Sequence, residues 1–329
     1  MLSMNFEQIS SQIKSQARSL GFDACGFAAA SPVNAEAIER YNRWIDTGRH
    51  GCMGWAAGHR DLRNDPSLLL EGARTVISLA LNYYPKCFQP PGTLRVAYYA
   101  YGRDYHEVLR ERLTELSDFI EKITHCATRP CVDSAPIRER YWAQQAGVGF
   151  IGRNNCLIIP GKGSFHFLGE IVTTAQLPPD EPCRMSCGDC GRCVDACPTG
   201  ALTVEGAADC NRCLSCLLIE DHAEALPDWV TAAVGDRVVG CDECQLVCPH
   251  NAAVVATDIE DFSPTRTVLT LTRDDVMHMT AGDFRRTFAH SAIARLRHKT
   301  LCRNVSNATH SPSSQDPTSG SESPKSHQS

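Results

Sequence analysis

The chain has 329 residues, of which 43% are hydrophobic, and this length suits about two domains. Its formal net charge of -6 excludes a general attraction to nucleic acid, although a local basic patch could still bind RNA. No stretch approaches the run of about 20 apolar residues that spans a bilayer, and the N-terminus lacks the pattern of a signal peptide. We therefore expect a cytoplasmic protein with no membrane partner.

Apolar spacing predicts alternating helices and strands over the first half of the chain. The expected helices cover residues 6–20, 35–47, 106–123 and about 136–145. The expected strands cover residues 24–30, 75–84 and 129–133, and a hairpin with a Gly-rich turn is expected over 156–174. This alternation predicts an α/β (α+β) domain over residues 1–178.

The second half of the chain changes character after the linker "LPPDEP". A cysteine-rich domain is expected over 179–252 and a short helical C-terminal segment, packing back on the core, over 253–305. Residues 306–329 are rich in Ser, Pro, Gly and Thr. Because they have almost no apolar residues to bury, we expect this tail to be disordered.

The cysteines carry the clearest chemical signal. The chain has 18 of them, and eleven fall between Cys183 and Cys248. A secreted disulfide protein would spread its cysteines through a short chain, whereas these are grouped at ligand spacings, which favours metal in a reducing compartment. The motifs are "CGDCGRCVDACP" and "CDECQLVCP".

These spacings predict two 4Fe-4S clusters in a domain like that of bacterial ferredoxins. Zinc also uses pairs of C-x2-C, but a zinc ribbon does not require C-x3-C-P, which occurs here twice. In two-cluster ferredoxins the cysteine before proline ligates the other cluster. One cluster is therefore assigned Cys187, Cys190, Cys193 and Cys248. The other is assigned Cys197, Cys241 and Cys244, and spacing leaves Cys210, Cys213 and Cys216 open as its fourth ligand.

Asp133 closes a short apolar strand at a place where a reacting group is expected in an open α/β sheet. The alternative is that it only supports the following turn or helix, which Ser134 would cap and Pro136 would begin. On local sequence the two interpretations are even. Asp104 and His106, near the start of the next helix upstream, carry little weight from spacing alone.

Together these segments resemble the epoxyqueuosine reductases over roughly residues 8–305. That family comprises cobalamin-dependent iron–sulfur oxidoreductases that complete queuosine in tRNA. The resemblance is carried by "NDPSLLLEGARTVISLALNYYP", "YGRDYHEVLRERL", "VDSAPIRERYWAQQAGVGFIGRNN", "FLGEIVTT", "RCLSCLLIE", "GCDECQLVCPHN" and "FRRTFAHSAIARLRHKTLCRN". The ferredoxin motif is common to many proteins, but "VDSAPIRERYWA" together with "RCLSCLLIE" is far more particular.

The resemblance implies cobalamin bound in the N-terminal domain beside the clusters. It implies that Asp133 is the proton donor and that Cys213 is the eighth cluster ligand. Arg63, Tyr105 and Glu220 fall in segments that resemble the family's cofactor pocket, with Asp133 beside them. The implied reaction reduces epoxyqueuosine to queuosine at the wobble position of tRNA, with electrons from an external donor.

The same resemblance also concerns the tRNA partner and the positions at which this chain differs from the family. A tRNA substrate favours phosphate contacts over an ordinary solvated helix face for the basic residues Arg285, Arg286, Arg295, Arg297 and Lys299. Cys216 stands where the family usually has Tyr, and His250 stands at a usual Trp. We expect a monomer. The alternatives are a cobalamin-dependent reductive dehalogenase, which usually carries an export signal, and a plain two-cluster electron carrier.

Overall fold

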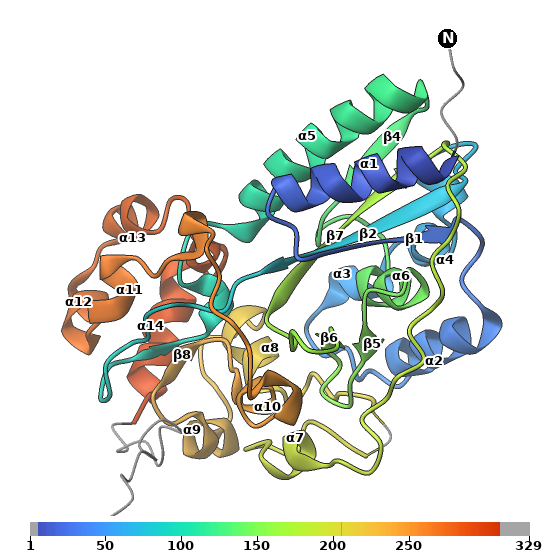
Figure 1. Cartoon of the computed structure of the whole chain (residues 1–329). Helices are drawn as coiled ribbons and strands as arrows, with labels where there is room; N and C mark the ends of the chain where they lie inside the picture. The colour runs from blue at the N-terminus through green and yellow to red at the C-terminus, as the bar shows by residue number, and fades with distance from the viewer. Residues whose placement is uncertain (1–5, 205, 310–329) are drawn as a thin grey trace, which may run out of the picture.

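The computed structural model describes residues 6–204 and 206–309 of the chain. Its centre is a four-stranded sheet in the order β1-β2-β7-β4, in which each neighbouring pair is antiparallel (Figure 1). The strands are β1 (Ala24–Ala29), β2 (Thr75–Asn82), β4 (Thr128–Cys131) and β7 (His166–Thr173). The mixed helix and strand class expected from the sequence is confirmed.

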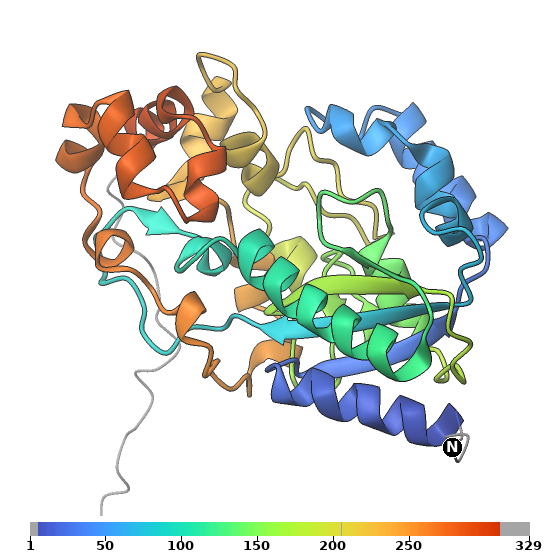
Figure 2. The same ribbon diagram turned by 90° about the horizontal axis from the view of Figure 1, so that it is seen from above.

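Helices cover both faces of this sheet (Figures 1 and 2). On one face lie α1 (Phe6–Ser19) and α5 (Tyr105–Thr124), which contact each other and the strands. On the other lies α6 (Glu139–Gln145), which contacts β1, β2 and β7. Successive β2 side chains alternate between the two resulting cores, as a strand buried on both faces requires.

Two local expectations are wrong. The helix expected from about residue 136 begins at Glu139 after Arg138, and the Ser134 hydroxyl donates to the Val132 carbonyl instead of capping it. The expected 156–174 hairpin does not form either. Its first strand, β6 (Leu157–Ile158), pairs with β5 (Phe150–Ile151), whereas β7 joins the main sheet between β2 and β4.

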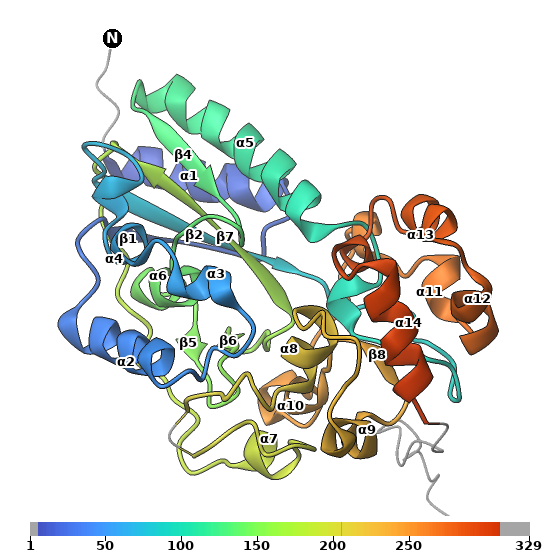
Figure 3. The ribbon, with the colours of Figure 1, turned by 180° about the vertical axis from the view of Figure 1, so that it is seen from behind.

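The cysteine-rich segment lies beyond the face of the sheet that α6 covers (Figure 3). Its short elements are α7 (Arg192–Asp195), α8 (Leu214–Ile219), α9 (Asp228–Val234), β8 (Arg237–Val239) and α10 (Glu243–Leu246). Strand β8 pairs in parallel with β3 (Arg95–Val96), which comes from the first half of the chain. Packing therefore crosses the domain boundaries expected from the sequence.

The C-terminal helices form a further layer against β3 and β8 (Figure 3). They are α11 (Arg266–Thr270), α12 (Arg273–His278), α13 (Ala281–Thr287) and α14 (His298–Asn307). Helix α14 continues past the expected start of the tail at residue 306, and the rest of the expected disordered tail, 310–329, lies outside the described residues. Within the described parts of the chain, no helix is long and apolar enough to cross a bilayer.

The remaining short elements connect these layers. Helices α2 (Ala35–Asp46), α3 (Gly54–Ala57) and α4 (Arg60–Asn64) follow β1. Single 3-10 turns cover Pro66–Leu68, Tyr98–Ala100, Pro249–Asn251, Glu260–Phe262 and Ala292–Arg295. One close approach fixes α6 on the sheet, because a Cβ at Gly26 would lie 2.0 Å from the Ala146 carbonyl oxygen.

Asn304 ties α14 to the cysteine-rich segment. It is fully buried, and its Nδ2 donates to the carbonyl oxygens of Leu218 (2.8 Å) and Val238 (2.9 Å). Asn304→Leu would leave both acceptors buried without their donor, so we expect unfolding to become easier by about 2–4 kcal/mol. Thermal unfolding of the cluster-loaded protein measures this. Ser306→Ala, at an exposed position of the same helix, should change stability by less than about 0.5 kcal/mol, and equal effects of the two changes would contradict the prediction.

Candidate functional site

Asp133 follows β4 in a backbone conformation that is unusual for a residue with a side chain. Its φ is 31°, and a non-glycine residue held there stores strain that the surroundings must offset. Its backbone N–H donates to Glu139 Oε1 at 2.6 Å, and its side chain is 44% exposed. The loop between β4 and α6 thus presents a carboxylate to the outside from a fixed backbone.

His106, in the first turn of α5, connects two aspartates. Its Nε2 lies 2.7 Å from Asp133 Oδ2, and its Nδ1 lies 2.6 Å from Asp104 Oδ1. The neighbouring ring of Tyr105 stacks on the imidazole at a centroid distance of 3.9 Å and on Phe167 at 4.3 Å. These contacts fix the His106 ring, and through it the Asp133 carboxylate.

The His106 and Asp133 side chains shift each other's pKa in opposite directions. Burial opposes the charged imidazolium, but hydrogen bonds to Asp104 and Asp133 outweigh it and raise the pKa of His106. Burial would likewise raise the pKa of Asp133, but the hydrogen bond and charge of His106, with a hydrogen bond from Tyr105, lower it. Burial and the charge of Asp133 raise the pKa of Glu139 to about 8. The hydrogen bond between His106 and Asp133 therefore favours the charged form of each partner, imidazolium on His106 and carboxylate on Asp133.

Arg295 belongs to this site. Its guanidinium contacts the His106 imidazole, and its Nη1 lies 4.0 Å from Asp133 Oδ2. The other basic residues grouped with it in the sequence are also exposed, and one of them, Arg286, pairs with Asp283 on its own helix. They are Arg285, Arg286, Arg297 and Lys299. Arg295 differs in that it also contacts His106 of the Asp133 site.

Arg63 and Glu220 meet through an exposed tryptophan. Trp55 Nε1 donates to Glu220 Oε2 at 3.3 Å, and the Arg63 guanidinium lies 5.6 Å from the centroid of the Trp55 ring. The charge of Glu220 also acts on Tyr99, whose ring packs edge-on against Tyr105. The four residues expected in a cofactor pocket thus form two pairs: Arg63 and Glu220, which both contact Trp55, and Tyr105, which hydrogen-bonds Asp133.

The thiols assigned to one cluster line a single hollow. Cys187, Cys190, Cys193 and Cys248 surround it, together with residues of the 153–158 loop, Pro249 and His250. The Arg153 guanidinium donates to the Cys190 carbonyl oxygen at its edge. Four thiols converging from two motifs are the donor set that a 4Fe-4S cluster uses, so the residues present fit that group.

The thiols assigned to the other cluster lie near one another in pairs. The charges of Cys241 and Cys213 act on Cys244, and that of Cys197 acts on Cys213, while Cys156, outside the assigned set, hydrogen-bonds Cys244. Cys213 directly precedes α8, whereas Cys216 lies in that helix and turns toward Cys52, with 3.6 Å between their sulfurs. The structure thus provides a physical distinction that cysteine spacing lacks.

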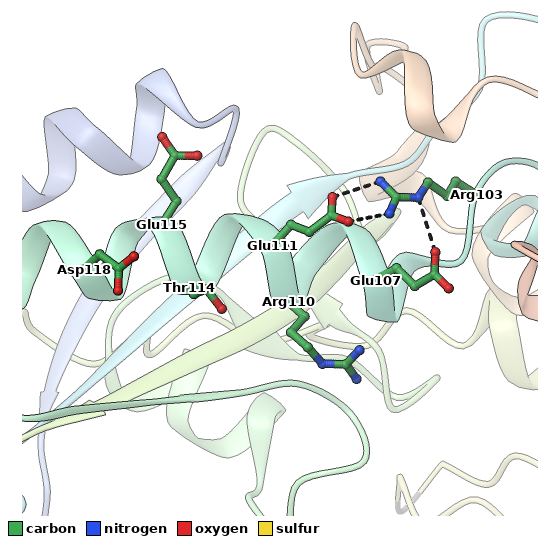
Figure 4. A pocket seen from close by; sticks show the side chains of 7 residues that line it. All are labelled: Arg103, Glu107, Arg110, Glu111, Thr114, Glu115 and Asp118. Carbon is green, nitrogen blue, oxygen red and sulfur yellow. Dashed lines mark hydrogen bonds and ion pairs between the residues drawn. The ribbon is translucent and has the colours of Figure 1, made fainter.

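An open hollow of about 530 Å³ lies elsewhere, along the outer face of α5 (Figure 4). Five charged side chains of that helix and Thr114 line it, together with Arg103, which pairs with Glu107 and Glu111. The other lining carboxylates, Glu115 and Asp118, are exposed to solvent. This hollow is separate from the Asp133 site and from the cysteines.

Sequence reasoning assigned His106 and Trp55 no role in the site. The signal for His106 was present in the run "RDYH", because a residue in the first turn of a long helix and the aspartate that caps it are held together. Nothing in the sequence placed this turn next to Asp133, since the two are 27 residues apart and meet only through the fold.

The fold and the converging cysteines define a class, a reductase with a two-cluster iron–sulfur domain. The family model described as "4Fe-4S double cluster binding domain" matches residues 186–251, and that described as "Epoxyqueuosine reductase QueG, DUF1730" matches residues 63–134. The epoxyqueuosine reductase of Cellulophaga algicola is 38% identical over 91% of this chain and 97% of its own, and that of Escherichia coli is 37% identical over 92% and 81%.

Solved structures of epoxyqueuosine reductases are also similar to this chain. An epoxyqueuosine reductase with an epoxyqueuosine-modified tRNA-Tyr stem loop matches with a TM-score of 0.84 and 30% identity, over 92% of this chain and 81% of that one. The enzyme from Bacillus subtilis, with its catalytic aspartate loop swung out of the active site, matches with a TM-score of 0.84 and 28% identity, over 92% and 82%. This chain belongs to the epoxyqueuosine reductase family.

The hydrogen bonds of His106 should make stability depend on pH. The pKa of His106 is higher in the folded protein than the unfolded value of about 6.5, so its charged form stabilises the fold. This stabilisation is complete below the unfolded pKa and is lost as pH rises through the folded pKa. The pKa of Asp133 is lower in the folded protein than in the unfolded chain, so its charged form stabilises the fold above a pH of about 4, and this stabilisation is lost as pH falls through the folded pKa. The difference in melting temperature between the unmodified protein and His106→Phe should therefore be largest near pH 5.5 and shrink toward pH 9. His278→Gln, at an exposed histidine, should show no such trend. A difference that does not vary with pH would disprove the assignment.

Proposed function

We propose that this protein reduces epoxyqueuosine to queuosine in tRNA, using electrons from two 4Fe-4S clusters and a cobalamin. The observation that carries the proposal is the Asp133 carboxylate, held outward by His106 in a chain of this family that also gathers two sets of four cysteines. The change from epoxide to alkene releases one oxygen as water and consumes two electrons and two protons. A site for this reaction must therefore supply both electrons and protons.

The clusters would supply the electrons. Cys187, Cys190, Cys193 and Cys248 are proposed to hold one cluster, and Cys197, Cys213, Cys241 and Cys244 the other. The convergence of the first set and the pairwise proximity of the second support this division, as does the turn of Cys216 away toward Cys52. Each cluster passes single electrons and must be reduced by an external carrier.

Cobalamin is proposed to bind between the two residue pairs, against Arg63 and Glu220 on one side and Tyr105 and Asp133 on the other. The support is the chemistry of these side chains. A large indole, that of Trp55, is 52% exposed beside charged groups that can hydrogen-bond amides, and this suits a flat ring with an amide rim. The bound cofactor would collect single electrons and act on the epoxide as a nucleophile.

Asp133 would deliver the proton to the departing oxygen. The lowered pKa of Asp133 in the free site disfavours its protonated form, so the proton is proposed to come from His106, whose pKa is raised, against the effect of burial, by hydrogen bonds to Asp104 and Asp133. Glu139 accepts a hydrogen bond from the Asp133 backbone N–H, and burial together with the charge of Asp133 raises the pKa of Glu139 to about 8, which places a protonated carboxyl beside the Asp133 carboxylate. Bound substrate that covers Asp133 would remove water and raise the pKa of Asp133, which favours transfer from His106.

The tRNA would lie over the same face. Arg285, Arg286, Arg297 and Lys299 are proposed to contact phosphates, because they are exposed on the segment that also carries Arg295 to the site. Arg295 would instead face the reacting end of the modified base. Such an enzyme acts in the cytoplasm, where tRNA is found, and we propose that it acts as a monomer.

Asp133→Asn tests the proton donor. The amide keeps the shape of the side chain but cannot supply the proton, so turnover should fall by about 100-fold or more. Mass analysis of nucleosides from reacted tRNA measures the loss of one oxygen. Absorption spectra should show both clusters and the corrin still bound. Full turnover in this variant would overturn the role of Asp133. Absence of the product from the unmodified enzyme would overturn the function itself.

Cys213→Ser tests the cluster assignment against two neighbours. We expect Cys213→Ser to lower iron content toward about half, because one of two four-iron clusters loses a thiolate. Cys210→Ser and Cys216→Ser are the matched controls, each three residues away, and should keep their iron. Iron and sulfide analysis after anaerobic purification gives the result. Loss of iron in the Cys216 variant alone would exchange the roles of the two cysteines.

A further inference from the structure

Three thiols outside the assigned cluster ligands lie together across a contact between distant parts of the chain, where the buried Cys216 hydrogen-bonds both Cys52 and Cys210. Cys52 Sγ lies 3.6 Å from Cys216 Sγ, although 164 residues separate the two positions. Cys52 is exposed, whereas Cys216 is buried in α8 with 7% of its surface accessible. Neither residue has a role in the function proposed above.

The contact is held firmly beside the thiol pair, by residues that precede each of the two cysteines. The Cys210 backbone N–H donates to the Arg49 carbonyl at 2.8 Å, and Trp44 Nε1 donates to the Ala208 carbonyl at 2.8 Å. Gly51 lies so close that a Cβ there would be 3.1 Å from the Asn211 nitrogen. The pair therefore lies within a fixed contact between two segments, and it is not a chance approach of two mobile loops.

We propose that Cys52 and Cys216 form a dithiol site that reacts with low-molecular-weight disulfides and closes to an intramolecular disulfide. The exposed Cys52 thiolate attacks the small disulfide, which forms a mixed disulfide and releases one thiol. The buried Cys216 thiolate then displaces the second thiol. Two protein thiols and one disulfide become one protein disulfide and two small thiols, so atoms and electrons balance. The sulfurs must close from 3.6 Å to about 2.05 Å, a movement that a change of side-chain rotamer can supply.

The bond would tie the segment before α3 to α8. That helix follows Cys213 and ends before Glu220, which the Trp55 indole already contacts. Oxidation would therefore fix the 52–55 segment against the helix that bears the proposed cluster ligand. A cross-link that closes so long a loop restricts the unfolded chain strongly, so the oxidised protein should melt at a higher temperature.

The test treats the cluster-loaded protein anaerobically with oxidised glutathione, followed by acid quench, alkylation and tryptic mapping. Cleavage after arginines places Cys52 in peptide 50–60, Cys216 in peptide 213–237 and Cys210 in peptide 193–212. We expect a cross-link between 50–60 and 213–237, located at Cys216 by fragmentation, with a mass lower by about 2 Da than that of the two reduced peptides. Dithiothreitol should reverse both the cross-link and the rise in melting temperature.

Variants make the outcome decisive. Cys216→Ser should stop at a glutathione adduct on Cys52, whereas Cys87→Ser, at another exposed thiol, should leave the cross-link intact. Cys210→Ser should also keep it. A stable glutathione adduct in the unmodified protein, a link through Cys210 or Cys213, or a metal ion bound at the pair in place of a disulfide would each overturn the proposal. Cluster absorbance, recorded before and after oxidation, shows whether any such change comes from loss of iron.

Discussion

The cysteine-rich segment has only a small apolar core of its own, and much of the structure follows from this constraint. That core has Leu214, Leu218 and Val230 among its members. Other parts of the chain therefore hold it. Asn304 donates to two of its carbonyls from α14, and β3 pairs with β8, its only strand within the part of the segment that the structure describes. The C-terminal helices are thus part of what shapes the two sets of thiols.

The same layer reaches the side chains around Asp133. The turn that precedes α14 brings Arg295 to His106, while α5 brings His106 to Asp133. Three segments far apart in the sequence thereby fix one carboxylate. A rigid scaffold of this kind explains how a loop with a strained backbone can present Asp133 in one orientation, because the strain at Asp133 is offset by contacts made elsewhere.

The sequence predicted the helices over 6–20 and 106–123 and the strand over 75–84 well, since each buries a regular apolar pattern. The expected start of α6 was too early, because Ser134 and Pro136 are residues that commonly begin a helix. Here they lie in a loop that is closed by the hydrogen bond from the Asp133 backbone N–H to Glu139. The sequence also paired β6 with β7, because proximity in sequence favours a hairpin while the wide sheet offers β7 longer partners. The role of His106 could not be predicted, because it depends on a contact that the tertiary fold makes.

Helix α8 lies between two of the residues proposed for the site, Cys213 and Glu220. It is six residues long, about 9 Å at 1.5 Å per residue, with Cys213 before its first turn and Glu220 after its last. The proposed cluster ligand and the proposed cofactor contact therefore lie at the two ends of one short helix. Burial of Leu214, Leu217 and Leu218 holds this helix in place. Movement of one end would move the other, so the separation of Cys213, proposed to hold a cluster, from Glu220, proposed to contact the cofactor, is set by the backbone of a single helix and not by flexible side chains.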